Sequence, residues 1–475
     1  MNGQWKTILV SKTMANRITS TKFSELNKTN RFEPKLYLFQ NTLKKIKERY
    51  RFVLIDEIAT SIIRGQSPKP ITYKDKMNGE YLFIRTADVK KYQFNTETAV
   101  YLNEQTFETQ KTNRISKDDI LISVVGNYLG STSVVPMNIE KGAFNDNSAR
   151  IRITDKTISP YYVSAFFNSV FGQQLIQSLV TRTGQKILSA GNVKKLSIPI
   201  IDNEIVSEKY QDATNKGVEA NSLISEAQKL FLSRLGIDFN AIPKDNLFSV
   251  RKKDFVEVDL WTPMYSFPLY VNTLRVLQKK WKTINIGKIA NLVKGDEVGS
   301  EAYIGYLDKR KTDVPFIRTS DIVNYEIDQY PDFFIPEEIH KELGQGFQKG
   351  DVLFTKDGKI GMVGMLTEYD KAILSSGFVG LRLKNDAKEY GISPEYLFLT
   401  LSIKEIGIYE SKRRTVVAST IPHLREERLK EMEIPILDKE TIDEITGLVK
   451  HAFKLKDEKK RLISEVREDM DNYFS

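Results

Sequence analysis

The polar and apolar positions of the chain form two patterns in a fixed order. Short runs rich in β-branched and aromatic residues come first, as in "YLFIRTADV" and "DDILISVVG", and Gly, Asp and Asn bound them. "VPFIRTSDIV" and "GDVLFTKDG" repeat this pattern later in the chain. Such runs predict short strands. A shorter helix is expected after Ser159 and after Ser393, because each serine can cap a helix whose first turn begins with proline.

Two long segments have the spacing of amphipathic helices. In residues 203–236 the apolar positions fall broadly on one side of a helix, and Gly236 is a good stop signal. In residues 439–474 apolar positions recur at every third or fourth place, as in a coiled-coil seam, with charges elsewhere. The apolar positions are Ile205, Val218, Ile224, Leu230 and Phe231 in the first segment and Ile442, Ile445, Val449, Ala452, Leu455, Leu462 and Val466 in the second.

The order of strands and helices occurs twice. "FIRTADV" begins at Phe83 and "FIRTSDI" begins at Phe316, which places the copies 233 positions apart, from 83 to 316. "DDILIS" and "GDVLFT" follow at a similar offset, and "LSIPI" and "MEIPI" precede the two long helices. The order is kept while the offset increases slightly, as loop insertions would cause. The sequence therefore predicts a tandem duplication of a domain-sized unit, since solenoid repeats are only about 20–50 residues long.

A long helix with one apolar stripe cannot bury that stripe alone, so the equivalent helix of the other copy is the expected partner. The predicted fold class is mixed α/β (α+β), with an internal pseudo-twofold duplication. Two tandem globular domains would be separated by two long antiparallel, coiled-coil-like helices. About 32 helical residues at 1.5 Å each span about 48 Å. That length corresponds to roughly 14 base pairs of B-DNA.

The charge of the chain favours an acidic partner. Lys and Arg number 71 against 62 Asp and Glu, a net charge of +9, which makes nucleic acid the first candidate. The absence of cysteine excludes a disulfide framework and a thiolate metal site and fits a reducing cytosol. No apolar run approaches the roughly 18–20 residues of a membrane span, and the first residues lack the apolar core of a signal peptide. A cytoplasmic protein without membrane insertion is expected.

The sequence lacks the motifs of the catalytic classes that bind or modify DNA. An amino-methyltransferase needs an Asn/Asp-Pro-Pro-aromatic loop, and no Pro-Pro occurs. "VVGNYLG" and "LVKGDEVG" are the nearest glycine-rich strings, and both are interpreted as β-turns. His340, His423 and His451 have no partner at metal-ligand spacing. We expect no catalytic residue, metal or cofactor. The alternative class is an enzyme with an unrecognised nuclease or methyltransferase site. "PDFFIPEEIHK" contains the carboxylates and the lysine that a nuclease site would need.

The ordered motifs resemble the specificity (S) subunit of type I restriction–modification systems. The resemblance covers the chain from about residue 31 and rests on the duplicated "FIRTxD", "DDILIS"/"GDVLFT", "TGQKILSAGNVKKLSIPI" and the helix after each "IPI". It implies that two target-recognition domains each read one half of a bipartite, gapped site in double-stranded DNA. These domains would span 31–200 and 250–436, and the spacer helices 201–237 and 437–475. Residues 1–30 would be an N-terminal extension.

The resemblance also implies partners. The two helices would dock methyltransferase (modification) subunits, in two copies, and a motor-nuclease (restriction) subunit can join the assembly. The chain would then be a non-catalytic subunit of a DNA-methylating complex. A type IIB-like or methyltransferase-only system stays open, because these systems differ in their partner subunits. The second copy departs from the pattern, since "RRTVVASTIPHLREERLKEMEIPI" at 413–436 lacks the Thr-Gly-Gln-Lys sequence.

Residues that read bases are expected where the two copies differ, because the two half-sites differ. Asn, Gln and Arg have the geometry for bidentate contacts with bases. Arg85 with Asp88, and Arg318 with Asp321, are identical in the two copies, so they are interpreted as structural pairs or as contacts to backbone phosphate. The DNA-binding candidates in divergent polar loops are Gln66, Asn127, Asn147, Arg150, Arg182, Gln185 and Lys186 in the first copy and Lys356, Lys359, Arg413 and Arg414 in the second.

Overall fold

The computed structural model divides into two compact units. It describes residues 6–8, 19–21, 34–69, 73–74, 79–126, 128–180, 186–245, 247–253, 260, 262–295, 297–298, 313–417 and 421–474. Unit 1 comprises Met1–Phe94, Ala99–Gln211 and Ile463–Ser475, and unit 2 comprises Asn95–Thr98 and Asp212–Leu462. The units cut across the domain ranges expected from the sequence, because each unit includes a part of both long helices. No helix within these described ranges is long and apolar enough to cross a membrane.

Unit 1 is built on two four-stranded sheets. The first has the antiparallel order β11-β10-β13-β4, and the second has the order β8-β5-β12-β9, in which β5 and β12 are parallel. Two two-stranded pairs, β6-β7 and β14-β3, complete the described strand structure of this unit, apart from the separate pair β1-β2. The strands are β1 (Lys6–Ile8), β2 (Thr19–Thr21), β3 (Phe52–Leu54), β4 (Ala59–Arg64), β5 (Tyr81–Ile84), β6 (Val89–Lys90), β7 (Gln93–Phe94), β8 (Val100–Leu102), β9 (Arg114–Ile115), β10 (Ile120–Ser123), β11 (Thr132–Val134), β12 (Gly142–Phe144), β13 (Ser148–Ile153) and β14 (Ser197–Pro199).

Unit 2 repeats this arrangement. Its sheets have the orders β22-β21-β24-β16 and β20-β17-β23, with β17 and β23 parallel, and its pairs β18-β19 and β27-β15 match those of unit 1. The pair β25-β26 is additional. The strands are β15 (Thr283–Asn285), β16 (Ala290–Val293), β17 (Val314–Ile317), β18 (Ile322–Val323), β19 (Glu326–Ile327), β20 (Phe334–Ile335), β21 (Val352–Thr355), β22 (Val363–Met365), β23 (Ile373–Leu374), β24 (Phe378–Leu383), β25 (Val416–Val417), β26 (Pro422–His423) and β27 (Glu433–Pro435).

The short helices also correspond between the units. Ser159 caps α5 and Ser393 caps α14, each through its side-chain oxygen and with proline in the first turn, as the sequence predicts. The helices of unit 1 are α2 (Pro34–Arg49), α3 (Ile55–Ile58), α4 (Glu104–Glu108), α5 (Pro160–Asn168), α6 (Val170–Leu179) and α7 (Ala190–Lys194). Those of unit 2 are α10 (Pro268–Lys280), α11 (Ile286–Ile289), α13 (Glu337–Leu343), α14 (Pro394–Ser402), α15 (Tyr409–Arg414) and α16 (Glu426–Lys430).

Buried polar contacts repeat with the strands. In unit 1 the Tyr162 hydroxyl donates to the Pro199 carbonyl, and in unit 2 the Tyr396 hydroxyl donates to the Pro435 carbonyl at 2.9 Å. Each contact joins the helix after the Ser-Pro sequence to the strand that precedes a long helix. Because strand order, helix order and buried hydrogen bonds all recur, the predicted mixed fold and its internal duplication are confirmed.

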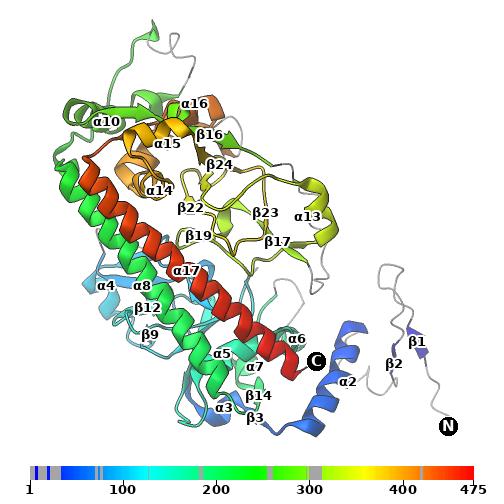
Figure 1. The fold of residues 1–475 in the computed structure, drawn as a ribbon. Helices are drawn as coiled ribbons and strands as arrows, with labels where there is room; N and C mark the ends of the chain where they lie inside the picture. Colours follow the sequence, from blue (N-terminus) through cyan, green and yellow to red (C-terminus); the bar gives the residue numbers. More distant parts are fainter. Residues whose placement is uncertain are drawn as a thin grey trace, which may run out of the picture. The chain divides into compact units, whose positions relative to one another are not determined.

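The long helices α8 (Glu204–Leu235) and α17 (Lys439–Tyr473) run side by side and antiparallel (Figure 1). Within unit 1, the Lys209 ammonium lies 2.9 Å from the Asp469 carboxylate. Within unit 2, the Lys216 ammonium lies 2.8 Å from the Glu458 carboxylate. Residue numbers increase along α8 while the numbers of their partners on α17 decrease, so the two helices are antiparallel. The predicted stop is also found, because Gly236 follows α8 with a φ of 60°.

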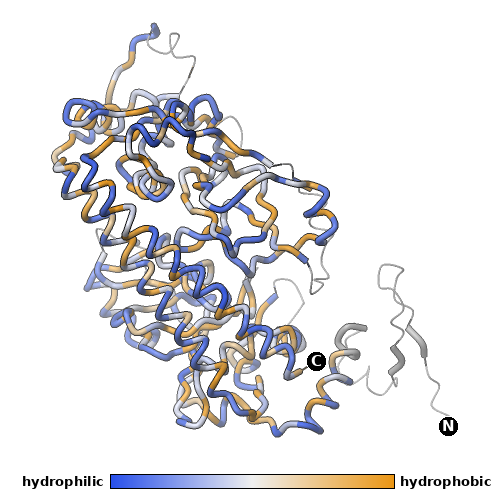
Figure 2. The backbone as a smooth tube through the Cα atoms, in the orientation of Figure 1, coloured by the Kyte–Doolittle hydropathy of each residue, from blue (hydrophilic) through white to orange (hydrophobic). Residues whose placement is uncertain are grey.

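The apolar stripe of α17 is the predicted one, and that of α8 is shifted. All seven apolar positions expected on α17 are buried, and polar and apolar turns alternate along it (Figure 2). On α8 the prediction for Ile205 is wrong, since its side chain is 65% exposed while Val206 is buried. The buried apolar residues of α8 recur three, four or seven positions apart: Val206, Tyr210, Ala213, Ala220, Ile224, Ala227, Phe231 and Leu235.

Unit 2 contains a set of buried charges, which we call the lysine cluster: Lys456, Lys459 and Lys460 of α17 with Glu326 of β19 and Asp370. Lys459 forms an ion pair with Glu326, and Lys460 lies 2.7 Å from Asp370. Lys456 is fully buried and donates to the Asn221 side chain and the Asn324 carbonyl, each at 2.8 Å. The sequence indicated charges outside the apolar seam of this helix, and these lysines are instead inside the unit.

The stability of unit 2 is expected to rise with pH above neutrality because of Lys456. Burial lowers the pKa of Lys456 to about 7, while the Glu326 carboxylate partly opposes this effect. In the unfolded chain a lysine has a pKa of about 10.4. Between these values the unfolded chain binds one more proton at this site, so the free energy of unfolding increases by up to about 1.4 kcal/mol per pH unit. Below about pH 7 both states are protonated, and this contribution to the slope disappears.

Denaturant unfolding of the wild type and of Lys456→Met between about pH 6 and about pH 9 measures this contribution as the difference between the two slopes of unfolding free energy against pH. Titrating groups that do not interact with Lys456 cancel in that difference. Lys454 is exposed two positions away on α17, so Lys454→Met is the matched control and should keep the wild-type slope. Equal slopes for the wild type and Lys456→Met would contradict the prediction.

Candidate nucleic-acid interface

The repeated heptapeptide forms the same turn in both units. In unit 1 the Arg85 guanidinium pairs with the buried Asp88 carboxylate through two hydrogen bonds, of 2.9 and 3.1 Å, and the Arg85 backbone N–H donates to the same carboxylate. In unit 2 Arg318 makes the corresponding bonds to Asp321 at 3.0 and 3.2 Å. A bidentate pair across a single 3₁₀ turn fixes the backbone between strand and hairpin. This geometry supports a structural role for the four residues.

The predicted polar loops of unit 1 come together, although they are far apart in the sequence. The Val124 N–H donates to the Asn147 carbonyl at 3.0 Å, and the Leu188 N–H donates to the Val124 carbonyl at 2.9 Å. The Gly65 N–H donates to the Ser148 carbonyl at 3.0 Å. These bonds join the loops that follow β4, β10 and β12 and the segment before α7.

The repeated turn borders the same group of loops. The Thr86 hydroxyl donates to the Asn145 side chain at 3.2 Å, and Asn145 lies in the loop between β12 and β13. Asp146 lies in the same loop, and its carboxylate accepts a hydrogen bond of 2.7 Å from the Ser67 hydroxyl. We call this group of loops, at 64–69, 86–88, 124–126, 128–131, 144–148 and 186–188, the loop cluster of unit 1.

Unit 2 has an equivalent loop cluster, at 297–298, 319–321, 355–361, 374–377 and 421–424. The Lys356 N–H donates to the Gly377 carbonyl at 2.8 Å, and the Leu424 N–H donates to the Lys356 carbonyl at 2.8 Å. The Ser375 N–H donates to the Ile317 carbonyl directly before the repeated turn. Corresponding loops are therefore joined by hydrogen bonds in both units, and these loops are among those in which the two copies differ in sequence.

Five of the predicted DNA-binding residues lie in these loop clusters. Gln66 and Lys186 are exposed and Asn147 is half-buried in unit 1. In unit 2 Lys359 is exposed, and the half-buried Lys356 lies 2.8 Å from the Asp357 carboxylate. The predictions for Asn127, Arg182 and Gln185 fall outside the described residues.

The side chain of Arg150 is inside unit 1 rather than on its loop cluster. Arg150 lies in the central strand β13 and is 5% exposed. Its guanidinium donates to the Arg114 carbonyl and, at 3.1 Å, to the Ser61 hydroxyl. Burial lowers its pKa below the usual value for arginine. These contacts favour a structural role, because a base reader needs its guanidinium free to face the groove.

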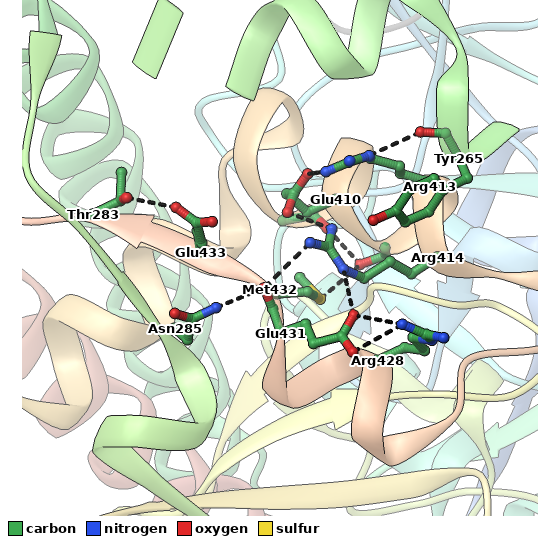
Figure 3. Close-up of polar contacts among 12 residues, drawn as sticks. Tyr265, Thr283, Asn285, Glu410, Arg413, Arg414, Arg428, Glu431, Met432 and Glu433 are labelled. Carbon is green, nitrogen blue, oxygen red and sulfur yellow. Dashed lines mark hydrogen bonds and ion pairs between the residues drawn. The ribbon is translucent and has the colours of Figure 1, made fainter. Parts of the chain in front are cut away.

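The side chains of Arg413 and Arg414 contact residues outside the loop cluster (Figure 3). Both belong to α15, and both guanidinium groups contact the buried Glu410 carboxylate one turn earlier. Arg413 also donates to the Tyr265 carbonyl at 2.9 Å and lies over the Tyr265 ring. Arg414 donates to the Glu431 carbonyl at 3.2 Å. These contacts hold α15 against the elements around it. The hairpin β25-β26 follows α15 directly in the chain.

Two polar residues of the loop clusters were not singled out from the sequence. The exposed Arg64 donates from Nε to the Asp146 carbonyl, directly before Gly65 and Gln66. The His423 Nδ1 is in hydrogen-bonding contact with the Asp357 carboxylate, which joins the hairpin β25-β26 to the loop 355–361. Arg64 could have been found, since it lies in the divergent loop that contains Gln66. The partner of His423 is 66 residues away, so no local pattern indicates it.

The described residues contain no group of three or more His, Asp and Glu side chains that could hold a metal ion. The loop clusters described above present amide, hydroxyl, lysine and arginine groups, beside the carboxylates of Asp146 and Asp357 and the ring of His423. Such groups can contact phosphate oxygens and the edges of bases.

Comparison with known proteins gave one family and several structures. A family model described as "Type I restriction modification DNA specificity domain" matches residues 47–207 and 278–463. The chain is similar to an S subunit of a type I restriction–modification system from M. genitalium, with 15% identity over 90% of this chain and 95% of that chain, and a TM-score of 0.35. It is similar to an HsdS subunit from Thermoanaerobacter tengcongensis, with 14% identity over 90% and 95% of the chains and a TM-score of 0.28. These TM-scores are too low to inform the function, and a search of curated proteins gave no match.

Proposed function

The chain belongs to the family of type I restriction–modification DNA specificity proteins, and from this we propose that each of its duplicated units reads one half of a split site in double-stranded DNA. Members of this family recognise DNA and act within restriction–modification complexes. They are recognition subunits, not catalysts. The observation that supports the proposal most is that the family match occurs twice, once on each unit, and that each unit has a loop cluster of the same construction.

In this proposal the loop clusters are the DNA-reading surfaces. Gln66, Asn147 and Lys186 contact the first half-site, together with Asn127, Arg182 and Gln185. Lys356 and Lys359 contact the second half-site. Arg150, Arg413 and Arg414 are left out, because their side chains are engaged inside the units. The turns at Arg85–Asp88 and Arg318–Asp321 set the loop conformation or contact phosphate.

The long helices serve as a spacer of fixed length between domains at 31–200 and 250–436 and dock two methyltransferase subunits. A rigid connection raises the effective concentration of the second reading surface once the first is bound. It also makes recognition depend on the separation of the two half-sites. A motor-nuclease subunit completes the complex when restriction accompanies modification. The complex acts where the chromosome is, in the cytoplasm.

Single-molecule methylation mapping tests this function. The host carries this chain with its methyltransferase partner and is compared with the same host lacking only this chain. We expect a split, gapped motif with one modified adenine in each half, present only with the chain. Methylation that is unchanged when the chain is removed, with the methyltransferase still present, would contradict the proposed function.

A further inference from the structure

The lysine cluster of unit 2 is a costly arrangement for a helix seam. Three lysines face two carboxylates, and all five side chains are almost fully buried. The attraction inside such a cluster seldom exceeds the cost of removing the charges from water. Apolar side chains of similar volume would stabilise the seam at least as well. Buried ionic groups are best attested where they fix the register of one element against another.

The cluster connects both long helices to one short hairpin. Lys456 of α17 donates to Asn221 of α8 and to the Asn324 carbonyl in the turn between β18 and β19. Glu326 of β19 is the shared partner of the lysines. A single hairpin turn is therefore in polar contact with both long helices within unit 2.

The hairpin turn itself is strained. Asn324 has a φ of 50° and Tyr325 a φ of 68°, a left-handed conformation that glycine adopts much more readily. The Tyr325 hydroxyl accepts a hydrogen bond of 3.0 Å from Gln228 of α8, so the strained turn is held by the same helices. Strain that is retained in a folded protein tends to occur where geometry matters for function.

The same hairpin begins at the reading surface. β18 starts at Ile322, directly after the Arg318–Asp321 turn that borders the loop cluster of unit 2. The Asp328 N–H donates to the Asp321 carbonyl at 2.8 Å, which closes the hairpin onto that turn. The chain thus passes from the loop cluster to the lysine cluster within a few residues. The lysine cluster and the reading loops are therefore linked by a short stretch of hydrogen-bonded backbone.

Unit 1 has a different contact at the equivalent place. Its hairpin β6-β7 has Tyr92 in the left-handed turn, and the Tyr92 ring packs against the Tyr210 ring of α8 at 5.3 Å. Gln93 holds the hairpin position that Glu326 holds in unit 2, since each pairs across its turn with the second residue of the preceding strand. The ionic contact is therefore a feature of the second unit.

We propose that the lysine cluster is a positioning device that fixes the register of the spacer helices on the second recognition domain and thereby determines which gap between half-sites is accepted. This inference rests on the proposed function. The cluster contributes to the selectivity for gap length, and the loop clusters contribute the selectivity for base sequence.

The test uses the full-length chain in complex with its methyltransferase partner and a balanced variant, Glu326→Gln with Lys459→Gln. Removing both members of the ion pair keeps the net charge of the cluster, because two lysines then face one carboxylate where three faced two. The matched control is Lys454→Gln, which removes an exposed charge from the same helix. DNA duplexes contain the mapped half-sites at the natural gap and at gaps one base pair shorter and longer.

We expect the wild type and Lys454→Gln to methylate the natural gap selectively. In the balanced variant the preference over the altered gaps should fall by about tenfold, the effect of roughly 1.4 kcal/mol of lost coupling, while the bases required in each half-site stay the same. A folded variant with unchanged gap preference would overturn the inference and leave the proposed function intact. A wild-type complex that methylates without regard to the split site would overturn both.

Hydrogen exchange on the isolated chain provides a second readout without DNA. In the balanced variant, backbone amides of 322–327 and 453–462 should exchange faster than in the wild type, while those of unit 1 should not change. Unchanged protection of these two segments would show that the ion pair does not hold the hairpin to the helix, and would also overturn the inference.

Discussion

Replacing Glu326 alone by glutamine is expected to lower the free energy of unfolding by about 3–5 kcal/mol. The carboxylate is 1% exposed and is the shared partner of three lysines. Without it, Asp370 is the one carboxylate left in the cluster for Lys456, Lys459 and Lys460. Uncompensated charge in a buried site costs far more than the loss of an exposed ion pair. Denaturant unfolding at neutral pH measures the effect.

A second substitution distinguishes charge imbalance from a simple packing defect. Adding Lys459→Gln to Glu326→Gln should recover most of the lost stability, because the number of positive and negative charges is again closer to balance. The interaction energy of the double-mutant cycle should then be large, up to about 3 kcal/mol. Lys454→Gln should change stability by less than about 0.5 kcal/mol. If the double variant is less stable than Glu326→Gln, the charges are not what stabilises this seam.

The elements of the fold could be predicted because their signals are local or repeated. Apolar residues three and four positions apart along α17 identify a helix whatever it packs against. Gly236 follows the end of α8, as expected of a glycine, which adopts a positive φ readily. The duplication is visible because the heptapeptide at Phe83 and Phe316 fills a buried turn in both units, where substitution is costly. The buried face of α8 was harder to predict, because small residues such as Ala213 and Ala220 form much of it and give a weak apolar signal.

The environment of individual charged residues could not be predicted. Lys456, Lys459 and Lys460 have helical spacing and resemble a solvated face, and their burial depends on Glu326 more than 100 residues away. Arg150 and Arg414 have the side chains expected of base readers, but their partners are set by tertiary packing. The loop clusters were predicted as separate divergent loops, and their convergence depends on strand order, which the sequence pattern does not give.

Replacing Glu410 by glutamine is expected to lower the free energy of unfolding by about 3 kcal/mol, because two guanidinium groups lose their carboxylate in a buried site. Glu410 and Arg414 are each 4% exposed, and Arg413 contacts the same carboxylate. Arg414 keeps the Glu431 carbonyl as a partner, which places the loss at the lower end of the range for buried pairs. Thermal or denaturant unfolding measures the loss, and Lys412→Gln on the exposed side of α15 is the control.

The same substitution should affect the two half-sites unequally if unit 2 reads one of them. α15 ends at Arg414, directly before β25, and β25-β26 is joined to the loop 355–361 through His423 and Asp357. Loosening α15 therefore displaces one wall of the loop cluster of unit 2 and leaves unit 1 unchanged. Methylation mapping with Glu410→Gln should show relaxed base requirements in one half-site only. Equal relaxation of both half-sites, with a stability close to that of Lys412→Gln, would contradict a positioning role for the Glu410 pairs.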